Sequence, residues 1–162
     1  MLTFQEIYDL YSDDIYRFAF SLAGDRHEAE DITSDTFVRA WVHKDRIRTE
    51  TLKAYFFTIA RNLFLEQRRK RKPYEALDDL HVDSSPTPDK VAESRVELRR
   101  VQKVLQALPE ADRTAFVLRV YHDLPYAEIA RVLQISLSAA KVRIHRVRRR
   151  LITTCIDKEA QQ

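Results

Sequence analysis

The sequence is poor in the residues that punctuate and crosslink a chain. Its 162 residues include one glycine, five prolines and a single cysteine, Cys155. One cysteine excludes an intrachain disulfide and a cysteine-based zinc site, and it fits a reducing compartment. No apolar run approaches the roughly 18–20 residues of a membrane span, and the acidic, periodic N-terminus is unlike a signal peptide. We therefore expect a cytoplasmic protein.

The scarcity of turn residues also favours helices over sheets. Strands need frequent glycine and proline turns, whereas this chain is rich in Leu, Ala, Arg and Glu. With 44% hydrophobic residues it can bury a core, and its length allows one domain of average size or two small ones. The predicted fold class is all-α.

Apolar residues at +3/+4 spacing mark the helices. Gly24 stands where a left-handed C-cap is wanted, and Asp25-Arg-His-Glu28 resembles a capping box that opens the second helix. Pro73 ends the third. The predicted helices span about residues 4–22, 25–42, 52–72, 91–107, 110–121, 126–133 and 137–151.

Composition changes between Pro73 and Ala92. This segment carries three prolines, a strong acidic bias and little periodicity, which is typical of a linker. The predicted organisation is therefore a domain at residues 1–72, a linker at 73–92 and a second domain at 93–162. Twenty extended residues reach about 70 Å, as far as about twenty base pairs of B-DNA. Such a tether allows both domains to contact one duplex about two turns apart.

The segment from Tyr126 to Leu151 is the most informative. One face of a short helix carries Tyr126, Ile129, Ala130 and Leu133. After a break in which Ser136 is a natural N-cap, the apolar face of a second helix carries Leu137, Ala140, Ile144, Val147 and Leu151. The other faces of that helix carry Lys141, Arg143, His145, Arg146, Arg148, Arg149 and Arg150. This pattern predicts a helix-turn-helix whose second helix enters a major groove, where arginines reach phosphates and guanine edges. The alternative is an amphipathic helix with a solvated basic face.

The third helix interleaves aromatic rings with cations. Aromatic faces stack on unpaired bases and cations hold phosphates, so the pattern suits opened or single-stranded DNA. Alternatively, most of these rings belong to the core. We assign Phe56 to the core; Tyr55 and Phe57 flank it and cannot both share its face. The interleaved residues are Tyr55, Phe56, Phe57, Arg61, Asn62, Phe64, Arg68 and Arg69.

Little in the chain suggests an enzyme. Asp31 and Asp35 lie one turn apart, a pattern that is most often a solvated acidic face. With His27 their spacing permits a metal site, but the signal is weak. No nucleophile–base pairing and no glycine-rich phosphate loop stands out. We predict no catalytic residues, no metal and no cofactor.

Three segments resemble the extracytoplasmic-function (ECF) sigma factors of bacteria, in the family's order and over nearly the whole chain. AEDITSDTFVRAW, residues 29–41, resembles the AED-LT-(E/D)TF-RAW signature. Residues 52–72, LKAYFFTIARNLFLEQRRKRK, resemble the segment that follows it, and residues 108–151 resemble the C-terminal region that binds the upstream promoter element. Three motifs in register are stronger evidence than any one alone.

The resemblance implies a non-enzymatic specificity subunit of RNA polymerase with three sets of site residues. Contact with the clamp helices of the largest subunit of core RNA polymerase is implied for Glu30, Asp31, Asp35 and Phe37. Recognition and melting of the −10 element is implied for Lys44, Arg46, Tyr55, Arg61, Asn62, Arg68 and Arg69. Recognition of the −35 element of promoter DNA is implied for Ser138, Ala139, Lys141, Val142, Arg143, His145 and Arg146. The family usually has a cognate anti-sigma factor, often tethered to the membrane, which holds both domains in an inactive state.

The chain departs from the family pattern in four places. Tyr55 replaces a tryptophan, Glu66 an aspartate, and Pro125 a serine or threonine. A common Gly-Thr-Val-Lys-Ser-Arg run reads Ser-Ala-Ala-Lys-Val-Arg at residues 138–143. Because hydroxyl donors are lost there, the family's usual −35 sequence does not transfer, and Val142 is free to contact a thymine methyl.

Two rival functions remain open at this point. A helix-turn-helix regulator acting as a homodimer without polymerase has no need of the acidic face or the aromatic-basic helix. A small helical nuclease that uses Asp31 and Asp35 would require divalent metal for cleavage.

Overall fold

A computed structural model describes residues 2–46, 52–71 and 99–160, with side chains described as far as residue 154. All regular structure within these ranges is helical, which confirms the predicted fold class. The linker at 73–92, residues 47–51 and the start of the helix predicted from residue 91 lie outside the described residues. The elements are α1 (Phe4–Ala23), α2 (Arg26–Val42), the 3₁₀ helix η1 (Lys44–Arg46), α3 (Leu52–Arg71), helical residues 99–107, α5 (Glu110–Val120), α6 (Tyr126–Leu133) and α7 (Leu137–Ala160).

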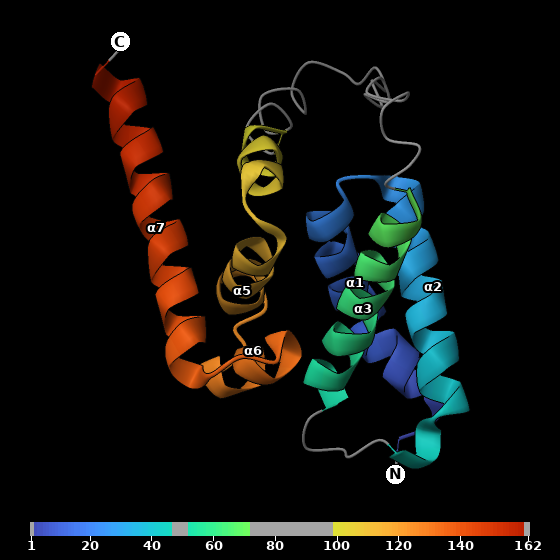
Figure 1. Ribbon diagram of the computed structural model, residues 1–162. Helices are drawn as coiled ribbons and strands as arrows, with labels where there is room; N and C mark the ends of the chain where they lie inside the picture. Colours follow the sequence, from blue (N-terminus) through green and yellow to red (C-terminus); the bar gives the residue numbers. More distant parts are fainter. Residues whose placement is uncertain (1, 47–51, 72–98, 161–162) are drawn as a thin grey trace.

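Helices α1, α2 and α3 pack side by side as the first helical unit (Figure 1). Their apolar faces meet because large residues recur every three or four positions. Each such side chain contributes about 1.5–3 kcal/mol on burial, so these rings and branched chains hold the unit together. Its largest fully buried side chains are Ile15, Phe18, Leu22, Ile32, Phe56 and Phe57.

The ends of α1 and α2 follow local chemistry. Gly24 has φ 69°, as predicted for a left-handed C-cap. Asp25 accepts a bond from the backbone N–H of Glu28 at 2.9 Å, so it caps α2. The predicted box is nevertheless incomplete, because the buried Glu28 carboxylate accepts instead from Arg71 at 3.0 Å. A full capping box that the sequence analysis missed joins Thr3 and Glu6.

The second helical unit contains residues 99–107, α5, α6 and α7. Asp123 (φ 51°) and Gln134 (φ 54°) take left-handed backbone conformations at the turns before and after α6. Aspartate is one of the few residues other than glycine that tolerate this conformation. The predicted apolar face of α7 is buried at Ala140, Ile144 and Val147. Leu137 was predicted on that face but is 46% exposed, because it is the first residue of α7 and projects beyond the core.

The two units pack against each other through α1 with α5 and α3 with α6 (Figure 1). The buried imidazole of His122 lies between two rings of the first unit. Its centroid is 4.8 Å from that of Phe57 and 6.1 Å from that of Phe18. The second unit therefore covers one face of the aromatic-basic helix α3.

Candidate nucleic-acid and polymerase interface

The predicted recognition helix is α7. Ser136 caps it: its Oγ accepts from the backbone N–H of Ala139 at 3.1 Å. With Ala140, Ile144 and Val147 held in the core, the opposite side of the helix faces solvent. Of the seven residues predicted to face the −35 element, Ala139 and Arg143 are half-buried, and the exposed ones are Ser138, Lys141, Val142, His145 and Arg146.

Arg143 differs from its neighbours on α7. Its Nη1 donates to Oδ1 of Asp112 at 2.8 Å, and Asp112 is only 3% exposed. The pair links α7 to α5, and a third of the Arg143 side chain stays in water. Arg143 therefore fixes the recognition helix in the unit as well as facing the predicted DNA side.

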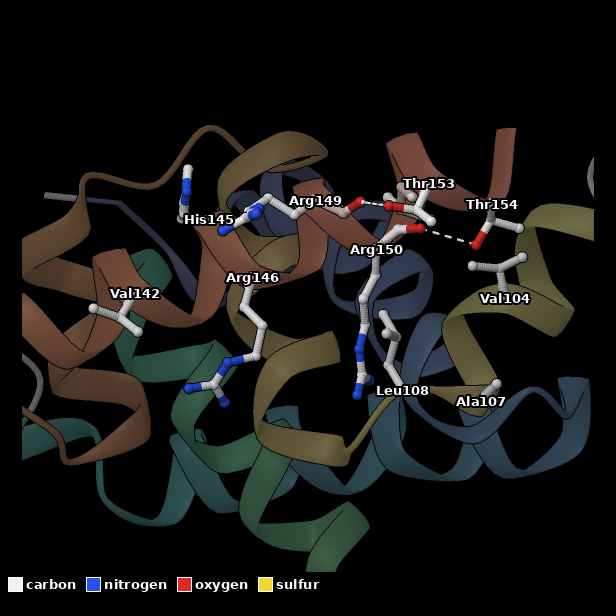
Figure 2. Close-up of a pocket in the computed structure, with 11 residues that line it drawn as sticks. Val104, Ala107, Leu108, Val142, His145, Arg146, Arg149, Arg150, Thr153 and Thr154 are labelled. Atoms are coloured by element: carbon white, nitrogen blue, oxygen red, sulfur yellow. Dashed lines mark hydrogen bonds between the residues drawn. The ribbon is translucent and has the colours of Figure 1, made fainter. Parts of the chain in front are cut away.

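A groove of about 790 Å³ runs between residues 104–108 and residues 142–154 of α7 (Figure 2). Val104, Ala107 and Leu108 form an apolar floor on one side. Figure 2 shows Arg150 of α7 extending toward Leu108, while Arg146 lies one turn earlier on the helix. The rim is basic and the floor is apolar.

The α3 residues predicted to bind the −10 element fall into two classes. Asn62 and Arg69 are exposed, as are Lys44 and Arg46 of η1. Arg68 is partly buried, and its Nη2 donates to the carbonyl oxygen of Ala23 at the end of α1 at 3.2 Å.

Arg61 of α3 forms an ion pair with the second unit. Its Nε and Nη2 donate to the two carboxylate oxygens of Glu110 at 2.7 and 2.9 Å. A guanidinium and a carboxylate that meet through two parallel bonds form one of the stronger ion-pair geometries. The predicted −10 surface is therefore partly engaged within the protein.

The aromatic residues of α3 are also divided. Phe56 and Phe57 are buried, whereas Tyr55 is half-buried, with its ring 6.2 Å from that of Phe56. Phe56 thus lies in the core as expected. Tyr55 is the flanking ring that remains partly accessible.

The acidic surface of α2 is accessible. Glu30, Asp31 and Asp35 are exposed, and Glu30 pairs with Arg26 at 3.0 Å. Phe37 was grouped with them, but it is 3% exposed and packs on Phe4, Tyr8 and Phe56. Its ring therefore supports the surface from beneath and does not form part of it.

An exposed apolar patch continues this surface and was missed in the sequence analysis. Val38 is 60% exposed and Trp41 48% exposed on α2, and Tyr8 of α1 lies beside them around a shallow hollow. Lys44 lies over the Trp41 ring at 4.3 Å. The signal was available, because residues 38 and 41 follow Asp35 at intervals of three.

The described residues form no group of three or more His, Cys, Asp or Glu side chains that could hold a metal ion, so His27, Asp31 and Asp35 do not gather into one. In the same part of the chain, none of the helices has the length and apolarity needed to cross a membrane.

Comparison with known proteins matches both units. Residues 7–74 match the model of sigma-70 region 2, and residues 98–151 match that of sigma-70 region 4. The ECF RNA polymerase sigma factor SigM of Bacillus subtilis is 33% identical over 93% of each chain. The chain belongs to the ECF sigma factor family.

The sigma factor's fold is also similar to two solved structures. One is RpoE of Bartonella quintana in complex with the anti-sigma factor NepR, which is 30% identical and covers 91% of this chain and 93% of its own, with a TM-score of 0.77. The other is CnrH in complex with the cytosolic domain of CnrY, which is 25% identical over 96% of this chain and 88% of its own, with a TM-score of 0.73. Membership in this family means that the protein is an alternative sigma factor that directs promoter-specific transcription by RNA polymerase. The polymerase-independent regulator is not favoured.

Proposed function

We propose that this sigma factor reads the −35 element with α7, docks on core polymerase with α2 and opens the −10 element with η1 and α3. The observation that carries the proposal is the division of α7 into two faces. Ala140, Ile144 and Val147 are buried, while Lys141 and Arg146 are exposed on the other side. A helix held in this way presents cations to a major groove without disturbing the fold.

Direct −35 readout is assigned to the exposed residues of α7. Arg146 and His145 donate to base edges, Lys141 holds a phosphate, and Val142, 54% exposed, contacts a thymine methyl. Ser138 and Ala139 lie in the first turn, where a backbone can approach a phosphate. Arg143 orients the helix through Asp112 and contacts DNA with its exposed part.

Docking on the polymerase clamp helices is assigned to α2. Asp31 and Asp35 project from one side, and Glu30 is adjacent. Because Val38 and Trp41 are exposed one and two turns further on, we extend the surface to them. A charged edge beside an exposed aromatic residue resembles the anchor and rim of a protein interface.

Opening of the −10 element is assigned to the accessible residues of η1 and α3. Lys44, Arg46, Asn62 and Arg69 are exposed and can hold the phosphates of a displaced strand. Tyr55 keeps part of its ring available for stacking on a base.

We also propose that the protein is not an enzyme, acts in the cytoplasm and is controlled by a cognate anti-sigma factor that can hold it at the membrane. Similarity to RpoE bound to NepR and to CnrH bound to CnrY supports such a partner. The predicted boundaries, 1–72, 73–92 and 93–162, are part of the same proposal.

The test is to mix the purified sigma factor with core RNA polymerase and map transcripts by run-off transcription on genomic fragments. We expect a stable complex and initiation at promoters that share two elements about two turns apart. A protein that binds duplex DNA yet neither joins the polymerase nor redirects initiation would be a regulator of another kind.

A further inference from the structure

An ion pair joins the two units at a DNA-binding position. Arg61 of α3 and Glu110 of α5 are 49 residues apart, and both bonds between them are below 3 Å. The Arg61 side chain is 14% exposed and that of Glu110 is 22% exposed, so the pair is largely shielded from water. The Thr114 hydroxyl donates to the same carboxylate at 2.9 Å, which fixes its direction.

A second contact ties the units at the end of α1. The side-chain amide of Gln106 donates to the carbonyl oxygens of Ser21 and Leu22 at 3.0 and 3.3 Å, and that of Gln102 donates to Phe20 at 3.2 Å. All three carbonyls lie in the last turn of α1, where a helix leaves carbonyls without helical partners, and the Phe20 carbonyl also accepts from the backbone N–H of Gly24 at 2.8 Å. A Cβ at Gly24 would lie 3.2 Å from Gln106, so this glycine allows the close approach as well as the left-handed turn.

The third contact is His122, buried between the Phe18 and Phe57 rings. It lies in the turn after α5, where Leu124 N–H bonds to the carbonyl of Leu118 at 3.0 Å. The three contacts involve both α1 and α3, so together they hold the second unit in one orientation.

This orientation conflicts with the role in −10 recognition that the family resemblance implies for Arg61. The Nε–Nη2 edge of Arg61 is on the Glu110 carboxylate, and this edge cannot bind a phosphate at the same time. In addition, α6, the first helix of the helix-turn-helix, packs on α3, which leaves no room for a DNA strand between them. RpoE in complex with NepR matches this chain over 91% of its length with a TM-score of 0.77, so its two units are arranged similarly when an anti-sigma factor is bound.

We infer that the sigma factor closes on itself, with Glu110 as an internal competitor of promoter DNA for Arg61. The closed form is held by this chain's own residues, and an anti-sigma factor stabilises an arrangement that already exists. Opening releases Arg61 to the −10 strand and separates α6 from α3. The inference rests on the proposed opening of the −10 element by α3 and on the role in it that the resemblance implies for Arg61.

The experiment measures the domain separation and DNA binding of the same full-length variants. Spin labels on Leu10→Cys and Ile152→Cys, both at exposed positions in different units, report the distance by pulsed electron paramagnetic resonance in a Cys155→Ser background. Glu110→Gln keeps the size of the side chain and an acceptor for Thr114 but removes the charge. Asp123→Asn is the matched control: it removes one carboxylate that is 96% exposed in the neighbouring turn, and asparagine tolerates its left-handed backbone.

We expect a narrow distribution of short distances between the spin labels when Arg61 and Glu110 are unchanged. The same distribution is expected for Asp123→Asn. Glu110→Gln should shift the open-to-closed ratio about tenfold, since a bond to a charged group is lost. The exchange Arg61→Glu with Glu110→Arg should restore the short distance. The inference is overturned if the unmodified protein is already open, or if Glu110→Gln leaves the distance distribution unchanged.

Binding to a fluorescent 20-nucleotide single strand of mixed sequence provides the second readout. Glu110→Gln should bind it several-fold more tightly, and the gain should vanish when Arg61→Ala is added. If Glu110→Gln opens the protein without tighter DNA binding, the closed form exists but Glu110 does not compete with DNA for Arg61, and that part of the inference is wrong. Such an outcome leaves the docking of α2 on polymerase and the −35 role of α7 untouched.

Discussion

Arg143, on the helix expected to read the −35 element, is anchored by Asp112 across 2.8 Å. Asp112 is buried and carries the negative charge that Arg143 neutralises. One side chain on the DNA-facing helix is therefore also a structural residue, and its substitution has two consequences that must be separated.

Arg143→Ala should lower the free energy of unfolding by about 3 kcal/mol. It leaves a carboxylate buried without its partner, and the value is at the lower end for buried pairs because part of Arg143 is in water. Arg146→Ala, at an exposed position, should change stability by about 0.5 kcal/mol or less. Denaturant unfolding followed by circular dichroism measures both.

DNA binding by Arg146→Ala, a variant that should keep its stability, tests direct readout. Arg146→Ala should lose about 1–3 kcal/mol of binding at the preferred −35 duplex and little at a scrambled one. Arg149→Ala is the comparison: if Arg149 contacts a phosphate, its loss should weaken binding to all sequences alike and reduce the salt slope by about one. Equal losses on both duplexes from Arg146→Ala would remove direct readout from this face.

Charge reversal at Asp31 and Asp35 should abolish binding to core polymerase. Both carboxylates are exposed on α2, so helicity and thermal stability should be unchanged. Asp13→Lys together with Asp9→Lys makes the same charge change on α1 and should leave binding intact. Polymerase affinity is measured by fluorescence anisotropy of the labelled sigma factor, and an unchanged affinity in the α2 variant would rule out the docking surface.

Tyr55→Ala should impair transcription from a fully duplex promoter and recover on a template mismatched across the −10 region. Removing a stacking ring costs about 1–3 kcal/mol per base, and the mismatched template has already undergone melting. Tyr55→Phe keeps the ring and should behave like the unmodified protein on both templates. An equal loss on both templates would make Tyr55 a packing residue.

Acid should open the closed form through His122. Burial lowers the pKa of His122 from 6.5 to about 4; the carboxylate of Asp14 opposes this shift, whereas the cations Lys53 and Arg17 reinforce it. Above pH 6.5 the His122 imidazole is neutral in both forms, so the closed form has its full stability relative to the open form. Between pH 6.5 and about 4 the imidazole is protonated in the open form but not in the closed form. The closed form therefore becomes less stable relative to the open form as the pH falls through this range.

The expected size is about a tenfold loss of closure between pH 7.5 and 5.5. The spin-label distance measured across this range provides the readout. His122→Gln should flatten the profile, because glutamine does not titrate. A profile that is the same for both proteins would show that other groups control the pH dependence.

Periodicity predicted much of the fold. Buried positions such as Ile144 and Val147 on α7 follow from +3/+4 spacing, and Gly24 and Ser136 from cap chemistry. These features depend on neighbours in sequence. The predictions for Leu137 and Glu28 were less accurate. The exposure of Leu137 at the start of α7 and the pairing of the Glu28 carboxylate with Arg71 both depend on elements that are distant in sequence.

The sequence predicted which types of residue form the candidate site, but it predicted less well which of their side chains are exposed and free of contacts within the protein. Cations on α3 and α7 were identified, but nothing local indicates that Arg61 meets Glu110 or that Arg143 meets Asp112. Those partners are 49 and 31 residues away. Likewise Phe37 reads as part of the acidic motif, although its ring is needed in the core. Long-range packing decides which members of a motif reach the surface.

Permanganate reactivity of thymines in the −10 element tests the central claim most directly. Core polymerase with the sigma factor should make these thymines reactive on a linear duplex promoter, and neither protein should do so alone. Tyr55→Ala should reduce the signal. Protection of the duplex by the sigma factor without polymerase, with no reactive thymines when both are present, would contradict the account.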